Sequence, residues 1–262
     1  MNIIQGIENY KPIKNPVLTV GSFDGVHLAH KALLAHLDGE AKALGGESLL
    51  VTFFPHPRQV LQSEDAYADR LRLLTTQEEK IRLLAKTGLQ NVLFLKFDQT
   101  LADMPYDTFV RDILVGTIGV RKAVVGFNHS FGKDRAGSFA NMQGLASRYG
   151  FESECFPEKM MTDEKLSSTR IRSLLAEGKV AEANTLLGYH YRMYGCWKEE
   201  GGFCVDDSLK LMPAAGNYLV RVRNGKKYDF TLGQVGERIL FPDMSTLKDG
   251  DAIKVTFVRE VK

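Results

Sequence analysis

Two histidines stand three residues apart in the segment GSFDGVHLAH, which covers residues 21–30. His27 and His30 follow Gly21 and Gly25 at the predicted start of a helix, so both imidazoles fall on one face of its first turn. The unpaired N–H groups and the dipole of a helix N-terminus favour an anion there. With glycines that let the backbone come close, the segment predicts a polyphosphate site. The two imidazoles could hydrogen-bond to charge that grows on phosphate oxygens as pyrophosphate leaves.

A metal site is the rival interpretation of this pair, because histidines at i and i+3 can share a cation. The rest of the sequence offers no third ligand at a recognisable spacing and no HExxH motif. The glycine loops GxGxxG and GxxxxGK[ST] are absent as well. The residues therefore favour phosphate over metal, and they exclude a dinucleotide dehydrogenase or a P-loop enzyme.

A second anion-binding segment is KLSSTRIRSLLAEG, residues 165–178. Ser167, Ser168 and Thr169 offer hydroxyl groups at a predicted helix start, and Arg172 lies one turn into that helix. Taken alone, this is an ordinary helix N-cap. Beside a histidine pair that needs a partner for a triphosphate, it becomes a second clamp for the same phosphates.

The elements that must position these residues alternate between strands and helices. Apolar runs rich in β-branched residues predict strands over residues 17–20, 48–54, 91–97 and 122–126, with helical periodicity between them. This βαβ pattern predicts a doubly wound, Rossmann-like α/β domain with a parallel sheet. Ligands bind beyond the carboxyl ends of such strands, which selects three segments: GSFDGVHLAH, FPHP (54–57) and FNHSFGKDRAG (127–137).

From about residue 191 the sequence pattern changes to a series of short strands without helices between them. This pattern predicts a small all-β barrel or sandwich. The clearest piece is NYLVRVRNGKKYDFTLG, residues 217–233, where Asn224-Gly225 predicts a type I′ hairpin turn. The chain is thus expected to form two domains, 1–190 and 191–262.

Composition limits the partners of the protein. A net charge of +2 over 262 residues, with both signs interspersed, predicts no nucleic-acid partner and no acidic membrane surface. No apolar run suits a membrane helix or a signal peptide, so a cytoplasmic location is expected. Cys155, Cys196 and Cys204 lack CxxC spacing, which indicates idle or buried thiols.

Taken together, five ordered motifs resemble the adenylyltransferase half of the bacterial FAD synthetase family, whose members combine riboflavin kinase and FMN adenylyltransferase. The first segment is similar to the GxFDGxHxGH signature of nucleotidyltransferases, a signature that several such enzymes share. The resemblance covers residues 15–190, and its motifs are GSFDGVHLAH, TFFPHP (52–57), RLLTTQEEK (72–80), VVGFNHSFGKDRAG (124–137) and SSTRIR (167–172).

The resemblance implies that FMN attacks the α-phosphorus of ATP, that FAD and pyrophosphate form, and that Mg²⁺ assists. His27 and His30 would stabilise the transferring phosphate, and Ser168, Thr169 and Arg172 would hold the β- and γ-phosphates. Asn128 would lie near the phosphates or the metal. The remaining substrate-binding positions implied are Gly21, Phe23, Asp24, Gly25, Phe54, Pro55, His56, Pro57, Phe131, Arg135 and Ser167, of which those around Pro55 would serve the flavin end.

Two departures from the family pattern matter. Ala29 replaces the glycine between the histidines, which adds a methyl group where phosphate approaches, so binding is expected to be tuned or slightly weakened. The region after residue 190 resembles pieces of the riboflavin kinase barrel, but it lacks the kinase's GxPTAN segment and the neighbourhood of its catalytic glutamate. A truncated barrel without kinase activity is therefore expected, as a structural remnant in preference to a flavin-binding module.

The alternative function is a non-catalytic flavin- or nucleotide-binding protein on the same scaffold. The histidine pair together with SSTRIR favours the enzyme, because a pure binder has no need of both clamps. A nucleotidyltransferase that uses CTP and a phosphorylated alcohol is a more distant alternative.

Overall fold

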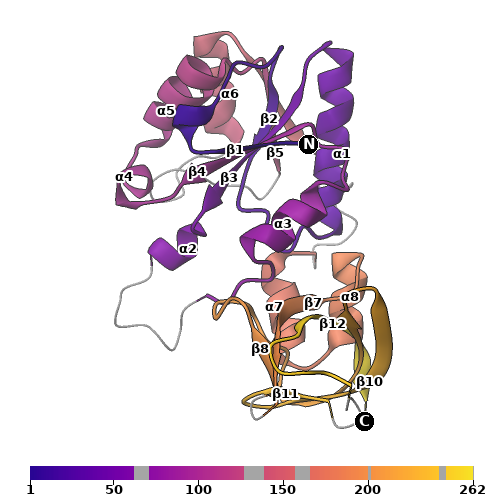
Figure 1. Cartoon of the computed structure of the whole chain (residues 1–262). Helices are drawn as coiled ribbons and strands as arrows, with labels where there is room; N and C mark the ends of the chain where they lie inside the picture. The colour runs from indigo at the N-terminus through magenta and orange to yellow at the C-terminus, as the bar shows by residue number, and fades with distance from the viewer. Residues whose placement is uncertain (62–70, 127–138, 157–165, 200–201, 242–245, 262) are drawn as a thin grey trace. The chain divides into compact units, whose positions relative to one another are not determined.

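The computed structural model describes residues 1–61, 71–126, 139–156, 166–199, 202–241 and 246–261. The chain forms two compact units, and Figure 1 shows the whole chain coloured by residue number. Unit 1 comprises residues 1–71 and 77–163, and unit 2 comprises residues 72–76 and 164–262.

Unit 1 is built on a parallel sheet whose six strands, counted over the described ranges, follow the order β1-β4-β3-β2-β5-β6. The central strands are buried on both faces, as the apolar runs predict. The predicted doubly wound, Rossmann-like fold is confirmed. The strands are β1 (Asn2–Gln5), β2 (Val17–Val20), β3 (Ser48–Phe54), β4 (Asn91–Lys96), β5 (Lys122–Gly126) and β6 (Glu152–Phe156).

Helices cover both faces of this sheet (Figure 1). One of them, α1 (Leu28–Ala43), places Leu33, Leu37 and Ala41 on one buried stripe. Among the described residues, no helix is long and apolar enough to cross a membrane. The other helical segments are η1 (Ile7–Asn9), α2 (Pro57–Val60), α3 (Gln77–Leu84), α4 (Gln99–Ala102), α5 (Tyr106–Thr108), the π-helical η3 (Phe109–Ile118) and α6 (Phe139–Tyr149).

The strands β1 and β6 were not among those that the sequence predicts. Each pairs with a single neighbour among the described strands, β1 with β4 and β6 with β5. Edge strands are half covered, so their sequences NIIQ and ESECF carry polar residues and do not read as continuous apolar runs. The four central strands carry the strong signal because both of their faces are buried.

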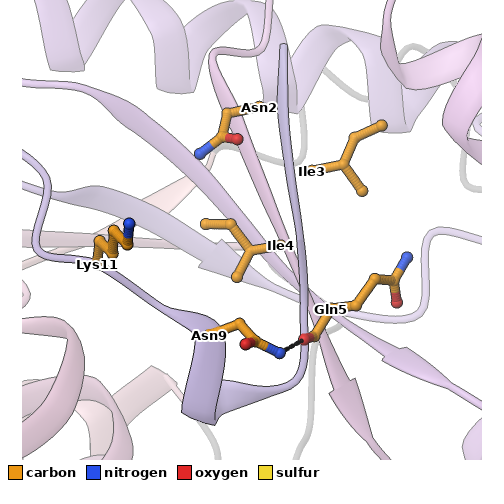
Figure 2. A pocket seen from close by; sticks show the side chains of 6 residues that line it. All are labelled: Asn2, Ile3, Ile4, Gln5, Asn9 and Lys11. Carbon is orange, nitrogen blue, oxygen red and sulfur yellow. Dashed lines mark hydrogen bonds between the residues drawn. The ribbon is translucent and has the colours of Figure 1, made fainter.

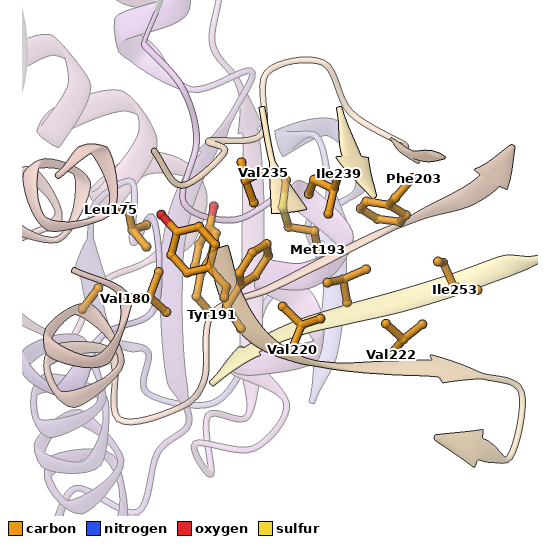
Figure 3. Close-up of a cluster of buried hydrophobic side chains, with 14 of the residues drawn as sticks. Leu175, Val180, Tyr191, Met193, Phe203, Val220, Val222, Val235, Ile239 and Ile253 are labelled. Atoms are coloured by element: carbon orange, nitrogen blue, oxygen red, sulfur yellow. The ribbon is translucent and has the colours of Figure 1, made fainter. Parts of the chain in front are cut away.

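The described residues of unit 2 form a closed antiparallel barrel and the helices α7 and α8, which confirms the predicted all-β barrel. The strand order is β10-β11-β8-β7-β12-β9. Side chains of the helices and of the strands point into one shared hydrophobic core, drawn in Figure 3. The elements are α7 (Ser168–Ala176), α8 (Val180–Leu187), β7 (Arg192–Lys198), β8 (Gly202–Val205), β9 (Gly216–Asn224), β10 (Lys227–Val235), β11 (Ile239–Leu240) and β12 (Ala252–Val261).

The hairpin between β9 and β10 turns one residue later than predicted. Asn224 pairs with Lys227, so the loop residues are Gly225 and Lys226. Of these two, Gly225 has the left-handed backbone, with φ at 57°, which fits a type II′ turn and not type I′. Asn224 stays in the ladder because it also pairs with Ile253 of β12, and its side-chain amide donates to Asp251 at 2.7 Å.

Residues 72–76 belong to unit 2 although unit 1 surrounds them in the sequence. Leu73 forms a parallel bridge with Lys210, and Leu74 is fully buried in the core of unit 2. The helices α7 and α8 also pack in that core, so the compact units divide the chain earlier than residue 190. The expected functional division into domains 1–190 and 191–262 stays a prediction.

Candidate nucleotide site

The loop after β2 lies at the point where the direction of strand addition reverses. β2 pairs with β3 on one side and with β5 on the other, and the chain adds further strands outward from both. In doubly wound sheets, ligands bind outside the carboxyl ends of the strands at such a switch point. The loop at the end of β2 is residues 21–27, which carry the predicted site. β5 ends at Gly126, and the predicted residues Asn128, Phe131 and Arg135 lie outside the described residues.

The backbone of this loop is strained. Phe23, Gly25 and Val26 have positive φ angles of 48°, 83° and 38°, which is costly for a bulky or β-branched side chain. Phe23, Asp24 and Val26 are nevertheless buried. Backbone strain of this kind persists where the surroundings over-determine it, and it clusters at ligand-binding sites. The loop therefore carries a local signature of function that is independent of its sequence motif.

The two histidines are brought together at the start of α1. His27 is the N-cap of the helix, and its Nδ1 accepts a hydrogen bond from the backbone N–H of His30 at 3.4 Å. The two rings stack with centroids 3.6 Å apart and planes 17° apart, and Phe23 stacks on His30 at 4.4 Å. Because Nδ1 of His27 accepts, the neutral ring carries its proton on Nε2. The single N–H of the ring is thus on a different nitrogen from the one that caps the helix.

Lys80 of α3 binds the backbone of this loop, a role that could not be predicted from the sequence. Its side chain is buried, and its ammonium donates to the carbonyl oxygen of Ser22 at 2.8 Å. Thr52 donates to the same oxygen at 3.3 Å. Burial lowers the pKa of Lys80 to about 8, and the charge of the nearby buried Asp24 opposes this shift in part. Lys80 is the last residue of the motif RLLTTQEEK, and nothing in that motif indicates that its side chain reaches the loop.

The predicted flavin-binding residues follow the carboxyl end of β3. Because β3 runs parallel to β2, they lie at the same end of the sheet as the loop after β2. Phe54 is 47% exposed, which is unusual for a large aromatic side chain in this unit. The peptide bond between Phe54 and Pro55 is cis. His56 is the N-cap of α2, whose first residue is Pro57, and its Nδ1 accepts from the backbone N–H of Arg58 at 3.2 Å.

The segment SSTRIR forms the start of α7 in unit 2. Ser167 is the N-cap, and its hydroxyl accepts from the backbone N–H of Arg170 at 3.2 Å. Ser168 and Thr169 occupy the first turn, and the guanidinium of Arg172 donates through Nε to the carbonyl of Arg72 at 3.0 Å. The predicted cap is confirmed in position. This segment and the histidine pair belong to different units, so their meeting at one triphosphate is part of the proposal below.

A second histidine of α1 has a structural role. His36 Nε2 lies 2.7 Å from Glu154, while Lys122 contacts Glu154 at 2.7 Å and Glu40 at 2.5 Å. Partial burial raises the pKa of Glu154, but hydrogen bonds from Lys122 and His36 outweigh it and hold that pKa below its ordinary value. His36, Glu40 and Glu154 are spaced for a metal ion, yet the ammonium of Lys122 already bridges the two carboxylates.

A pocket beside the edge strand β1 does not include the predicted site. Figure 2 shows its lining, which comes from β1, η1 and the chain just after η1. The amide of Asn9 donates to the carbonyl of Gln5 at 2.7 Å there. None of the predicted site residues lines it; the lining residues are Asn2, Ile3, Ile4, Gln5, Asn9 and Lys11.

A parallel sheet with a strained glycine loop and a histidine pair at its switch point is typical of nucleotide-binding α/β proteins. Residues 10–170 match the model of the FAD synthetase family, and the chain belongs to that family. The chain is 34% identical over 196 residues to the bifunctional riboflavin kinase/FMN adenylyltransferase of Haemophilus influenzae, covering 74% of the chain and 62% of that relative. The Listeria monocytogenes protein of the same name is 30% identical over 243 residues, covering 89% of the chain and 76% of that relative.

A solved structure matches along the whole chain. The crystal structure of a macrolide-efflux protein from Streptococcus pneumoniae has a TM-score of 0.87 and 23% sequence identity, and the match covers 100% of both chains. At that level of identity the likeness shows the fold alone.

Proposed function

We propose that the protein is an FMN adenylyltransferase, in which the phosphate of FMN attacks the α-phosphorus of ATP, FAD forms and pyrophosphate leaves. The observation that carries this proposal is the stacked pair His27 and His30 at the start of α1. Family membership narrows the nucleotidyl acceptor to FMN, because the relatives named above are FMN adenylyltransferases as well as kinases.

The histidine pair suits transition-state stabilisation. Negative charge moves onto the bridging and terminal oxygens of pyrophosphate as the bond to the α-phosphorus breaks. Donors fixed before the reaction stabilise such charge without the cost of reorganising water. His27 is held as a helix cap and His30 lies between two aromatic rings, so both imidazoles are fixed in advance.

The start of α7 supplies the second phosphate contact in this proposal. Ser168, Thr169 and Arg172 would hold the β- and γ-phosphates, where the exposed first turn of a helix favours an anion. Arg172 would present a planar guanidinium to two phosphate oxygens. The exposed Phe54 at the end of β3 would contact the isoalloxazine ring, together with Pro55, His56 and Pro57.

Magnesium fits this arrangement chiefly as a partner of the ATP phosphates. Mg²⁺ takes oxygen ligands and is usually bound through few protein groups plus substrate phosphates. The carboxylate of the loop, Asp24, is buried and faces the charge of Lys80, so it is partly neutralised already. Asn128 would offer an amide oxygen. When bound, the cation would neutralise charge on the phosphates.

The barrel of unit 2 is proposed to lack riboflavin kinase activity. Residues 209–211, after β8, pair through their backbone with Leu73. Leu73 donates to the carbonyl of Leu209 at 2.7 Å and accepts from the N–H of Leu211 at 2.8 Å. Lys210 is buried, and its ammonium donates to the carbonyl of Leu74 at 2.6 Å. A segment used in this way is not available as a phosphate-binding loop.

The direct test is to incubate the purified protein with ATP, Mg²⁺ and FMN and to separate the flavins by chromatography. The expected result is FAD together with an equal amount of pyrophosphate. Saturable binding of FMN and ATP without any FAD would favour the non-catalytic alternative. Formation of a product from CTP and a phosphorylated alcohol, and not from ATP and FMN, would move the protein to a different nucleotidyltransferase class.

A further inference from the structure

Cys196 and Cys204 are direct cross-strand neighbours in the barrel of unit 2. The register of β7 and β8 places them opposite each other, next to the pair formed by Trp197 and Phe203. Those two aromatic side chains pack in the core, and side chains alternate along a strand, so both thiols point to the outer face of the barrel. Cys204 is exposed and Cys196 is partly buried.

The geometry of this pair suits a covalent link. The backbone N–H of Asp206 donates to the carbonyl of Tyr194 at 3.1 Å, and two residues along the ladder Cys196 and Cys204 again form a hydrogen-bonded pair. The Cα atoms of such pairs lie about 5.5 Å apart, and disulfides bridge Cα atoms separated by about 4.4–6.8 Å. On its other side Cys196 pairs with Ala252, whose methyl group leaves the outer face open.

We propose that Cys196 and Cys204 form an oxidant-sensitive dithiol that closes to an intrachain disulfide on exposure to a peroxide. The thiolate of the exposed Cys204 attacks one oxygen of hydrogen peroxide, the O–O bond breaks, and hydroxide leaves and is protonated to water. The thiolate of Cys196 then attacks the sulfur of the resulting sulfenic acid, the S–S bond forms, and a second water leaves. The two thiols lose two protons and two electrons, which reduce the peroxide to two waters.

The disulfide is expected to be easily reduced. In hydrogen-bonded cross-strand pairs the Cβ atoms lie near the wide end of about 4.5–5.5 Å, whereas a disulfide draws them to about 3.5–4.5 Å. The strands must therefore approach locally, and strained or exposed disulfides have less negative reduction potentials. The bond should respond to the thiol and peroxide levels around the protein and should not serve as a permanent staple.

Cys155 is a built-in control. It lies on β6 in unit 1, whereas both barrel cysteines belong to unit 2. Burial, reinforced by the charge of Glu154, raises the pKa of the Cys155 thiol and so reduces the reactive thiolate. It should stay alkylatable under conditions that close the barrel pair.

The test treats the reduced full-length protein with a small excess of hydrogen peroxide, blocks the remaining thiols with iodoacetamide, and digests with trypsin without reduction. Cleavage at arginine and lysine separates the two cysteines into peptides 193–198 and 199–210, while Cys155 lies in peptide 149–159. We expect a linked pair 193–198/199–210, a fall from three alkylatable thiols to one, and full reversal by dithiothreitol.

Matched variants sharpen the result. Cys196→Ser and Cys204→Ser should each abolish the linked pair, and Cys155→Ser should leave it unchanged. The peptide map of the wild type alone shows whether Cys196 and Cys204 are linked. The test therefore remains decisive even if a variant fails to fold. The proposal is wrong if Cys155 appears in the link, if the disulfide joins two chains, or if Cys204 oxidises further with no link to Cys196.

Discussion

Single side chains at the loop after β2 serve both the fold and the proposed chemistry. His27 caps α1 through Nδ1 and is also one of the two imidazoles of the proposed phosphate site, so a change to alanine removes two contributions at once. Lys80 holds the carbonyl of Ser22 in place and keeps a buried charge close to Asp24. Substitutions that separate the structural from the chemical contribution are the informative ones.

His27→Asn and His30→Ala test the phosphate role. Asparagine is among the best N-caps, so His27→Asn should keep the stability of α1 while removing the imidazole donor. Loss of one preorganised donor typically lowers turnover about 10²–10³-fold, and we expect a fall of this order in FAD formation for each variant. His36→Ala, on the same helix but bonded to Glu154, should retain turnover. Normal rates in both site variants would exclude the proposed donors.

Lys80→Met tests the buried charge beneath the loop through its pH dependence. The pKa of Lys80 in the folded protein is about 8, against 10.5 for an ordinary lysine. Between these values the unfolded chain holds a proton that the folded protein has released, so the free energy of unfolding rises with pH. The variant lacks this titration. The stability of the wild type relative to Lys80→Met should therefore increase from about pH 7 to about pH 10 in urea unfolding. A constant difference would mean that Lys80 titrates normally.

At the scale of elements, the start of α7 combines a cap with a proposed phosphate clamp. Ser167→Ala should lower the free energy of unfolding by about 1 kcal/mol, because it leaves the N–H of Arg170 without its side-chain acceptor. Ser167→Asp should retain the cap, since aspartate and serine cap equally well. Its negative charge should nevertheless raise the KM for ATP while leaving the KM for FMN unchanged. Chemical denaturation and steady-state kinetics on the three proteins separate the two effects. An unchanged KM for ATP in Ser167→Asp would remove α7 from the triphosphate site.

The central elements could be predicted from sequence because their signal is local. The runs 17–20, 48–54 and 122–126 coincide with β2, β3 and β5, whose residues are buried by helices on both faces. Edge strands lack that signal. The predicted turn was one residue too early because Asn224 pairs with Ile253 of β12 and therefore stays in the sheet. That strand lies almost thirty residues later, beyond the reach of a short-range sequence pattern.

At the scale of the whole molecule, the side-chain contacts that sequence reasoning missed depend on register or on long-range packing. The histidine pair is a local motif, so its position at a helix start could be predicted. Lys80 reaches Ser22 across 58 residues of sequence, and Lys210 reaches Leu74 across 136. The pairing of Cys196 with Cys204 follows from the ladder of β7 and β8 and not from any cysteine spacing. Tertiary packing decides each of these, and composition and periodicity do not contain it.

The last prediction concerns unit 2 as a whole: the protein should convert FMN to FAD but should not convert riboflavin to FMN. The barrel keeps a fully packed core that also buries α7 and α8, so it is needed for the fold whether or not it is a catalyst. The segment after β8, where a phosphate-binding loop would have to be sought, is instead bound to Leu73 and Leu74. The measurement is chromatography after incubation with riboflavin, ATP and Mg²⁺, with the bifunctional Haemophilus influenzae relative as the positive control. FMN formed by this protein above the level of a no-enzyme blank would show that kinase chemistry survives. Lys210→Met would then tell whether the segment after β8 contributes, since a kinase loop there should lose activity while FAD formation from FMN stays unchanged.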